Sequence, residues 1–255
     1  MRRKANGTFL WVSIVTKELE DVMSCNVLQV IDALPSELTE VYQRMVQQIE
    51  ARQQRDRERC LLVLSTATAA YQPLRLEELG VLSGLPSDIA GKTDLVTMIV
   101  NMCGSFLTIQ DEYVYIIHQS ASDFLSREGS SFIFPSGTKD VHYRVFSTSI
   151  QVMLKMLKRD MYDLSTPGFP IDEVQQSKQD PLAAARYSCA YWIDHLCDSS
   201  GAAGHYDVLR DGGIVDNFIR EKCLQWLEAL SLSKAMSKGV LAMAKLEKLV
   251  QVIFN

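Results

Sequence analysis

Residues 105–125, Ser-Phe-Leu-Thr-Ile-Gln-Asp-Glu-Tyr-Val-Tyr-Ile-Ile-His-Gln-Ser-Ala-Ser-Asp-Phe-Leu, decide the fold of this chain. They predict a strand, a polar turn at Gln110–Glu112, a second strand, and a histidine, His118, at the start of a helix. Two shorter helical patterns, Leu76–Ser83 and Thr93–Cys103, come just before. Helix, helix, hairpin and helix in this order predict a winged helix, a fold that either binds DNA or transmits a conformational change inside a larger signalling protein.

Outside this segment the hydrophobic pattern is mostly helical. Further helices are predicted at about residues 38–49, 60–71, 140–161, 180–196, 214–230 and 233–254, with Ser36, Asp140 and Asp180 as their caps where a cap is visible. The charged stretch 51–59 is predicted to be solvated, and Phe132–Phe134 gives a weak strand signal. The predicted fold class is therefore mainly α: a helical bundle plus a winged helix with a small β-hairpin, followed by an α-helical module.

The beginning of the chain looks like the middle of a helix. Phe9, Leu10, Ile14 and Leu19 lie on one helical stripe, and nothing before them closes a domain. We therefore expect that this polypeptide begins inside a fold.

The composition restricts the function. The 255 residues are 47% hydrophobic and 22% charged, with a formal net charge of -5, which is ordinary for a soluble globular protein and gives no general attraction to phosphate backbones. No segment approaches the roughly 20 apolar residues needed to span a bilayer, so no membrane contact is predicted. Six cysteines lie singly within apolar helical patterns, which indicates a reducing, cytoplasmic location.

One tripeptide, Gly91-Lys92-Thr93, resembles the end of a phosphate-binding loop. That loop needs a glycine where this chain has Pro86, and it needs a preceding strand where Leu76–Gly84 has a helical pattern. Proline also lacks the N–H that would contact phosphate. We interpret the tripeptide as an ordinary loop before a helix capped by Thr93 or Asp94.

Catalytic and metal-binding patterns are absent from the sequence. His195 and Cys197 point in different directions on one helix and cannot form one ligand face with Cys189. The sequence contains neither HExxH nor the GxSxG that a hydrolase reading would require. We predict no enzyme activity, no catalytic residue and no metal site in this chain.

DNA binding is the alternative function that the predicted winged helix leaves open. Such a module needs cations on its second helix and wing to displace counterions from the DNA. Here neither 93–103 nor 105–118 contains Lys or Arg, and 93–103 is apolar nearly all round, which predicts burial. A stand-alone nucleic-acid-binding protein is therefore the weaker alternative, and we predict no nucleic-acid partner.

His118 differs from the other histidines because it lies where a strand ends and a helix begins. The pattern alone favours a histidine that caps the helix or forms a hydrogen bond in the core, over a functional side chain.

Five segments resemble fungal NACHT-type signalling NTPases, which are NOD-like receptors of the STAND class, linked to heterokaryon incompatibility and often joined to WD40, ankyrin or TPR repeats. The segments are GTFLWV at 7–12, LPSELTEVY at 34–42, CGSFLT at 103–108, IHQSASDFL at 117–125 and RYSCAYWIDHL at 186–196. The resemblance covers nearly the whole chain, and the order of the segments is more specific than any one of them.

The resemblance places this chain after the nucleotide-binding core. It implies a helical domain at 1–72, a winged helix at 73–128 and an α-helical module at 129–255 that leads toward repeats absent here. In such proteins a histidine matching His118 contacts the β-phosphate of bound ADP. Walker A and B motifs are absent from this sequence, so we expect a regulatory fragment that binds ADP or ATP only when joined to a nucleotide-binding half. The implied partners are that half and a repeat domain, in cis or trans, and homo-oligomers stay open.

Overall fold

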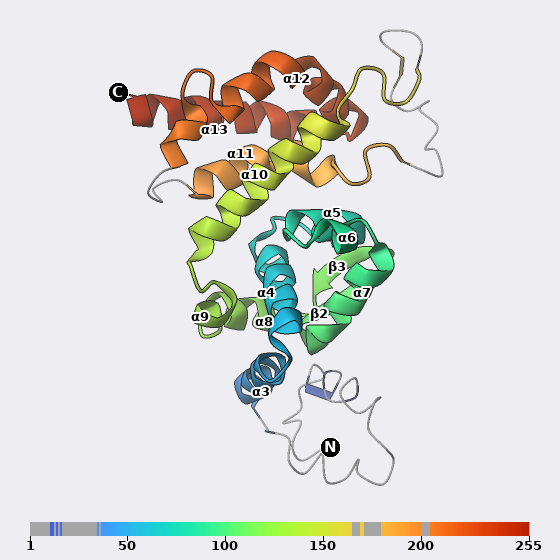
Figure 1. Cartoon of the computed structure of the whole chain (residues 1–255), viewed down its shortest axis with the longest axis vertical. Helices are drawn as coiled ribbons and strands as arrows, with labels where there is room; N and C mark the ends of the chain where they lie inside the picture. Colours follow the sequence, from blue (N-terminus) through green and yellow to red (C-terminus); the bar gives the residue numbers. More distant parts are fainter. Residues whose placement is uncertain are drawn as a thin grey trace.

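The computed structural model describes residues 11, 12, 14, 16, 35, 37–164, 169–170, 180–199 and 205–254. Helices dominate these residues, and the strands form one small antiparallel sheet, which confirms the mainly α fold class (Figure 1). Two hydrophobic clusters divide the described chain into a first lobe, α3 to α9 with the sheet, and a second lobe, α10 to α13. None of the described helices is both long enough and apolar enough to cross a bilayer.

The first lobe is built from short elements around one core. In chain order they are α3 (Leu38–Glu50), α4 (Gln54–Ala69), β1 (Leu74–Arg75), α5 (Leu76–Leu82), α6 (Ser87–Ala90), α7 (Thr93–Met102), the 3-10 turn η1 (Gly104–Phe106), β2 (Leu107–Gln110), β3 (Tyr113–Ile116), α8 (Gln119–Ser126) and α9 (Ser130–Ile133). The helical spacing at Val41, Met45 and Ile49 buries one face of α3, as predicted. Trp11 and Ile14 are buried in the same cluster, whereas Phe9, Leu10 and Leu19 lie outside the described residues.

The sheet has the strand order β1-β3-β2, and both pairings are antiparallel. The predicted hairpin pairs Leu107 with Ile116 and Gln110 with Tyr113. Its two turn residues, Asp111 (φ 49°) and Glu112 (φ 68°), are both left-handed, which matches the twist of a two-residue hairpin loop. β1 adds a third strand that the sequence pattern did not indicate.

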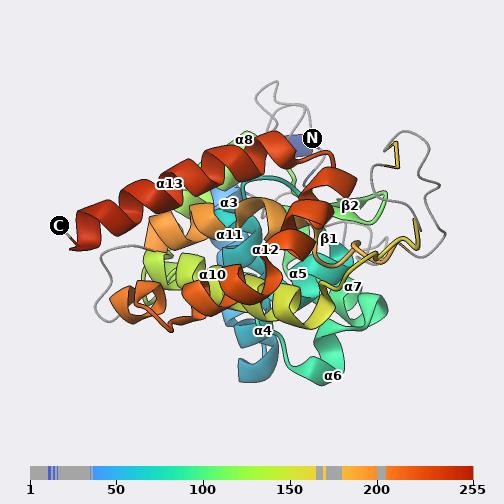
Figure 2. The same cartoon turned by 90° about the horizontal axis from the view of Figure 1, so that it is seen from above.

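The second lobe contains four long helices. They are α10 (Thr138–Met156), α11 (Arg186–Ser199), α12 (Ile214–Leu232) and α13 (Met236–Phe254), with a 3-10 turn, η3 (His205–Leu209), before α12. α13 packs along α11 (Figure 2), and Trp192 makes edge contacts with Phe218 and Trp226 in the core. α10 belongs to both lobes, because Val145 lies in the first cluster and Phe146 in the second.

Several predicted boundaries were wrong. Phe132–Phe134 is not a strand, because α9 and its last turn occupy these residues. The charged stretch 51–59 contains no buried residue, in agreement with the prediction that it is solvated, but α4 already begins at Gln54, before the predicted start at about residue 60. α7 is buried on one face only, with Met98 60% exposed, because α4 and α5 cover just one side of it.

Helix starts differ from the predicted caps as well. α10 begins at Thr138 after Gly137 (φ 94°), so Asp140 lies inside the first turn and is not the cap. Asp180 is followed by turns, and α11 begins only at Arg186. α10 also ends at Met156, before the predicted residue 161. Ser36 lies outside the described residues, and Glu37 occupies the N-cap position of α3.

Candidate functional site

His118 lies between β3 and α8, at the strand-helix junction that the sequence predicted. Its backbone is extended (φ −162°, ψ 156°), and it is the N-cap of α8. The Nδ1 atom accepts a hydrogen bond from the backbone N–H of Ser120 at 3.1 Å. This bond confirms the helix-cap interpretation, and the phosphate-sensing role that the resemblance implies stays a prediction. The side chain is exposed, so the other ring nitrogen remains accessible.

A buried tyrosine is connected to this cap through the hydroxyl group of Ser120. The Ser120 hydroxyl oxygen lies 2.9 Å from His118 Nδ1 and 2.9 Å from the Tyr42 hydroxyl. Tyr42 comes from α3, is 1% exposed, and packs against the rings of Phe106 and Phe124. Burial raises the pKa of the Tyr42 hydroxyl, although its bond to Ser120 opposes this shift. Tyr42 therefore stays protonated and is available as a donor.

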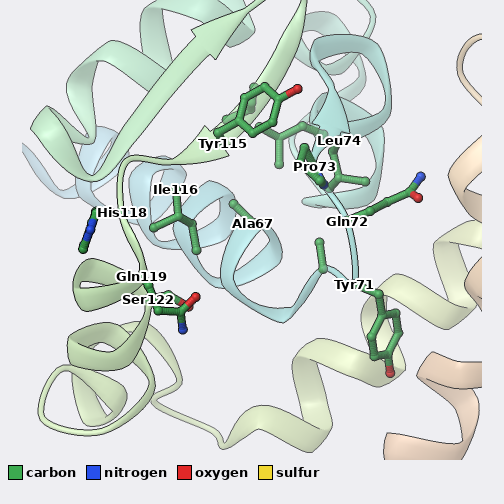
Figure 3. Close-up of a pocket in the computed structure, with 13 residues that line it drawn as sticks. Ala67, Tyr71, Gln72, Pro73, Leu74, Tyr115, Ile116, His118, Gln119 and Ser122 are labelled. Carbon is green, nitrogen blue, oxygen red and sulfur yellow. The ribbon is translucent and has the colours of Figure 1, made fainter.

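A groove of about 270 Å³ runs from His118 along β3 and the end of α4. Figure 3 shows His118 at one end of this groove and Tyr71 at the other, with Pro73 and Ile116 between them. The described residues that line the groove include neither Lys nor Arg. An anion there would therefore meet neutral polar side chains and the imidazole of His118, with no Lys or Arg among the described lining residues.

Beyond Tyr71, a chain of hydrogen bonds connects the two lobes. The Tyr71 N–H donates to the Tyr187 hydroxyl at 3.1 Å, and that hydroxyl lies 2.7 Å from His195 Nε2. His195 Nδ1 lies 2.8 Å from His142 Nδ1. If the Tyr187 hydroxyl donates to His195 Nε2, His195 carries its hydrogen on Nδ1 and donates it to His142; in the other tautomer His195 donates to Tyr187 and accepts from His142. We call Tyr71, His142, Tyr187 and His195 the inter-lobe cluster.

The inter-lobe cluster is held in its neutral form. Burial, with a smaller contribution from His142, lowers the pKa of His195 to about 3. Burial also lowers the pKa of His142, although Asp198 acts in the opposite direction. Both lowered pKa values favour uncharged imidazoles near neutral pH, and a neutral pair can form the direct nitrogen-to-nitrogen bond.

Glu78 is another buried polar group at the contact between the two lobes, where it is 2% exposed. Its carboxylate accepts from the backbone N–H of Tyr187 at 2.8 Å and from that of Arg75 at 3.1 Å. Burial raises the pKa of Glu78, and these two hydrogen bonds partly oppose the shift. The carboxylate thereby ties α5 of the first lobe to the start of α11 in the second.

The other sequence candidates do not converge on a site. Gly91-Lys92-Thr93 follows α6, a helix and not a strand, and leads into α7, whose N-cap position is Lys92 without a side-chain cap. His195 and Cys197 lie on α11, and within the described part of the chain no three histidine, cysteine or acidic residues form a metal-binding group.

Sequence reasoning missed the inter-lobe cluster. His142 and His195 are 53 positions apart, and each lies on a helix that carries several other polar residues, so neither stands out in the sequence. The available signal was weak: Tyr187, Tyr191 and His195 recur at four-residue spacing, which places three hydrogen-bonding rings on one face of α11. Only the packing of α10 against α11 shows that His195 contacts His142.

The comparisons with known proteins give one relative. The chain is 42% identical over 262 aligned residues to the vegetative incompatibility protein HET-E-1 of Podospora anserina. The alignment covers 96% of this chain but 19% of that protein, so the chain spans about a fifth of the relative's length. No protein-family model matches the chain, and no solved structure matches it.

Proposed function

We propose that this chain is a non-catalytic regulatory segment of a fungal NACHT-type signalling NTPase of the incompatibility or innate-immunity type. It would follow the nucleotide-binding half in the longer protein and pass the state of that half to a repeat domain. We also propose that the protein is cytoplasmic and that the Walker motifs belong to the nucleotide-binding half, outside this segment.

The observation that carries the proposal is the 42% identity to a vegetative incompatibility protein over 96% of this chain. It agrees with the five NACHT-like sequence segments, which are spread over the same length. Within the predicted range 73–128, two helices (α5 and α7), the β2–β3 hairpin and the helix α8 follow one another in the order expected of a winged helix, which supports this part of the proposal.

The role of His118 is the specific part of this proposal. An accessible imidazole at a strand end, beside a groove lined without Lys or Arg, is suited to contact one phosphate oxygen presented by another domain. It is poorly suited to hold a free nucleotide alone. We propose that His118 contacts the β-phosphate of ADP bound in the nucleotide-binding half and holds the closed state until exchange.

The nucleic-acid alternative finds no support in the charges of α7. Its exposed positions are Thr93, Asp94, Met98 and Asn101, which offer one anion and no cation to a phosphate backbone. A DNA-binding helix would instead need exposed cations to contact the phosphate backbone.

Titration calorimetry of the isolated chain with ADP and with ATP is the first test. We expect no binding at micromolar concentrations, because a single imidazole supplies too few contacts. Micromolar affinity for either nucleotide would overturn the proposal that this segment only regulates.

The second test concerns the longer protein. The 5′ end of the native transcript is sequenced, and the full frame is expected to contain a GxxxxGK[ST] loop upstream. In that protein, His118→Ala and His118→Asn should both lower ADP retention at least tenfold, whereas Ser122→Ala, in the same groove, should not. Asparagine can still cap α8. Normal ADP retention by His118→Asn would therefore show that His118 acts only as a cap.

A further inference from the structure

The contacts of His118 bear on which of its nitrogens carries the hydrogen. Two groups of Ser120 face Nδ1: the backbone N–H at 3.1 Å and the hydroxyl oxygen at 2.9 Å. The backbone N–H can only donate and favours a lone pair on Nδ1, but the hydroxyl, at the shorter distance, can either donate to that lone pair or accept from an Nδ1–H. When both groups donate, they share the one Nδ1 lone pair, and in the neutral ring the hydrogen is then on Nε2.

Tyr42 determines what the Ser120 hydroxyl does. The Tyr42 oxygen lies 2.9 Å from Ser120 Oγ, and Tyr42 is the buried partner, packed in a three-ring cluster with Phe106 and Phe124. When Tyr42 donates to Ser120 Oγ, the serine hydrogen is directed to His118 Nδ1. The result is a continuous relay from the core of α3 to an exposed imidazole.

We infer that Tyr42 and Ser120 are positioning residues that hold His118 as an oriented Nε2–H donor for a phosphate oxygen. This inference takes its ligand, a phosphate oxygen, from the proposed function. The hydrogen-bond geometry of Tyr42, Ser120 and His118 does not depend on that function. It adds a regulatory connection: α3 lies in the segment before the sheet, and a shift of α3 that withdraws the Tyr42 hydroxyl releases the orientation of His118. The state of the upstream helical segment is thereby transmitted to the phosphate-contacting nitrogen.

The relay is tested by nitrogen NMR of the histidine rings in the nucleotide-free chain at about pH 8.5, where an ordinary imidazole is neutral. His118→Asn identifies the His118 signals by their loss. We expect the Nδ1 signal of His118 at the position of a bare ring nitrogen and the Nε2 signal at that of a hydrogen-bearing one. In Tyr42→Phe and Ser120→Ala both signals should move toward each other, as the second tautomer becomes populated.

Three variants separate positioning from general destabilisation. Ser120→Thr keeps a hydroxyl and should restore the wild-type signals, whereas Tyr115→Phe and Ser122→Ala, which alter other groove residues, should leave them unchanged. A hydrogen on Nδ1 in the wild-type protein would overturn the inference. So would unmoved His118 signals in both Tyr42→Phe and Ser120→Ala.

The same variants in the longer protein distinguish this inference from the proposed function. Shifted NMR signals with at least a threefold loss of ADP retention in Ser120→Ala, rescued by Ser120→Thr, are the expected result. Shifted signals with unchanged ADP retention in all His118 variants would refute the proposed function and leave the relay intact. Unshifted signals with lost retention in His118→Asn would refute the relay alone.

Discussion

At the scale of single residues, His118 uses its two ring nitrogens for different purposes. Nδ1 ends a hydrogen-bonded chain that starts in the core at Tyr42, and Nε2 is accessible beside the groove. The structural and the proposed functional roles of this residue are thus separable by mutation, because they depend on different atoms.

The capping role predicts a stability difference between two substitutions. His118→Ala removes the acceptor for the Ser120 N–H and should lower the free energy of unfolding by about 1 kcal/mol. His118→Asn supplies a side-chain oxygen at the same N-cap and should stay within about 0.5 kcal/mol of the wild type. Urea denaturation of the isolated chain measures both values. Equal losses in the two variants would contradict the capping role.

His195 predicts how stability depends on pH. Its folded-state pKa of about 3 lies below the ordinary value of 6.5. Between these values the unfolded chain binds more protons, so stability is fully present above pH 6.5 and falls as the pH falls toward 3. This residue alone should cost about 2 kcal/mol between pH 6.5 and pH 5. Denaturation midpoints measured across this range should fall less steeply in His195→Gln, and an unchanged slope would contradict the prediction.

The sequence predicted one of these sites and not the other for a physical reason. His118 is placed by its neighbours along the chain, since a strand ends and a helix begins within three residues of it. The contact between His142 and His195 joins two helices across 53 positions and depends on how α10 packs against α11. No local pattern encodes that contact.

At the scale of elements, hydrophobic periodicity predicted the helices and strands that bury a continuous apolar face. It missed the elements whose structure depends on pairing or packing with another segment. α3, the hairpin, α12 and α13 were placed within about three residues, whereas the end of α10 and the start of α11 were placed wrongly by a full helical turn or more. β1 has only two residues, too few for an alternating pattern, and becomes a strand because Leu74 pairs with Val114. The start of α4 was missed because charged residues carry no hydrophobic period.

Gly80 fixes how closely α5 approaches its neighbours. A Cβ atom at this position would lie 2.5 Å from the carbonyl oxygen of Ala90 and 2.8 Å from a methyl group of Val96. Gly80→Ala should therefore destabilise by about 1–3 kcal/mol, although alanine favours helices by about 1 kcal/mol. Gly91→Ala is the control, because no atom lies within 4 Å of its Cβ position. Equal urea midpoints for the two variants would refute this packing argument.

At the scale of the whole molecule, the inter-lobe cluster and Glu78 join two separate cores. Tyr187 is central, because its hydroxyl bonds both Tyr71 and His195, and its backbone N–H bonds Glu78. Polar groups of each lobe thus form buried hydrogen bonds with polar groups of the other lobe. We expect the lobes to unfold together as long as this joint is intact.

Tyr187→Phe tests the joint with a minimal change. It leaves the Tyr71 N–H and His195 Nε2 without their buried partner and should lower the free energy of unfolding by about 1–3 kcal/mol. Tyr115→Phe, on the exposed side of β3, is the control and should have little effect. Circular dichroism and tryptophan fluorescence during urea denaturation measure both. A Tyr187→Phe midpoint equal to that of the control would show that the joint contributes nothing to stability.

Glu78 also has a consequence during synthesis of the chain. The elements of the first lobe are complete once Ile133, the end of α9, has left the ribosome, but the partner of Glu78, the N–H of Tyr187, is 109 positions away from Glu78. Until α11 emerges, the nascent first lobe exposes a carboxylate and the apolar surface around it, the kind of surface that chaperones bind. A ribosome paused before residue 187 would therefore present an incomplete lobe to the quality-control machinery, and a premature stop there would yield a product prone to degradation.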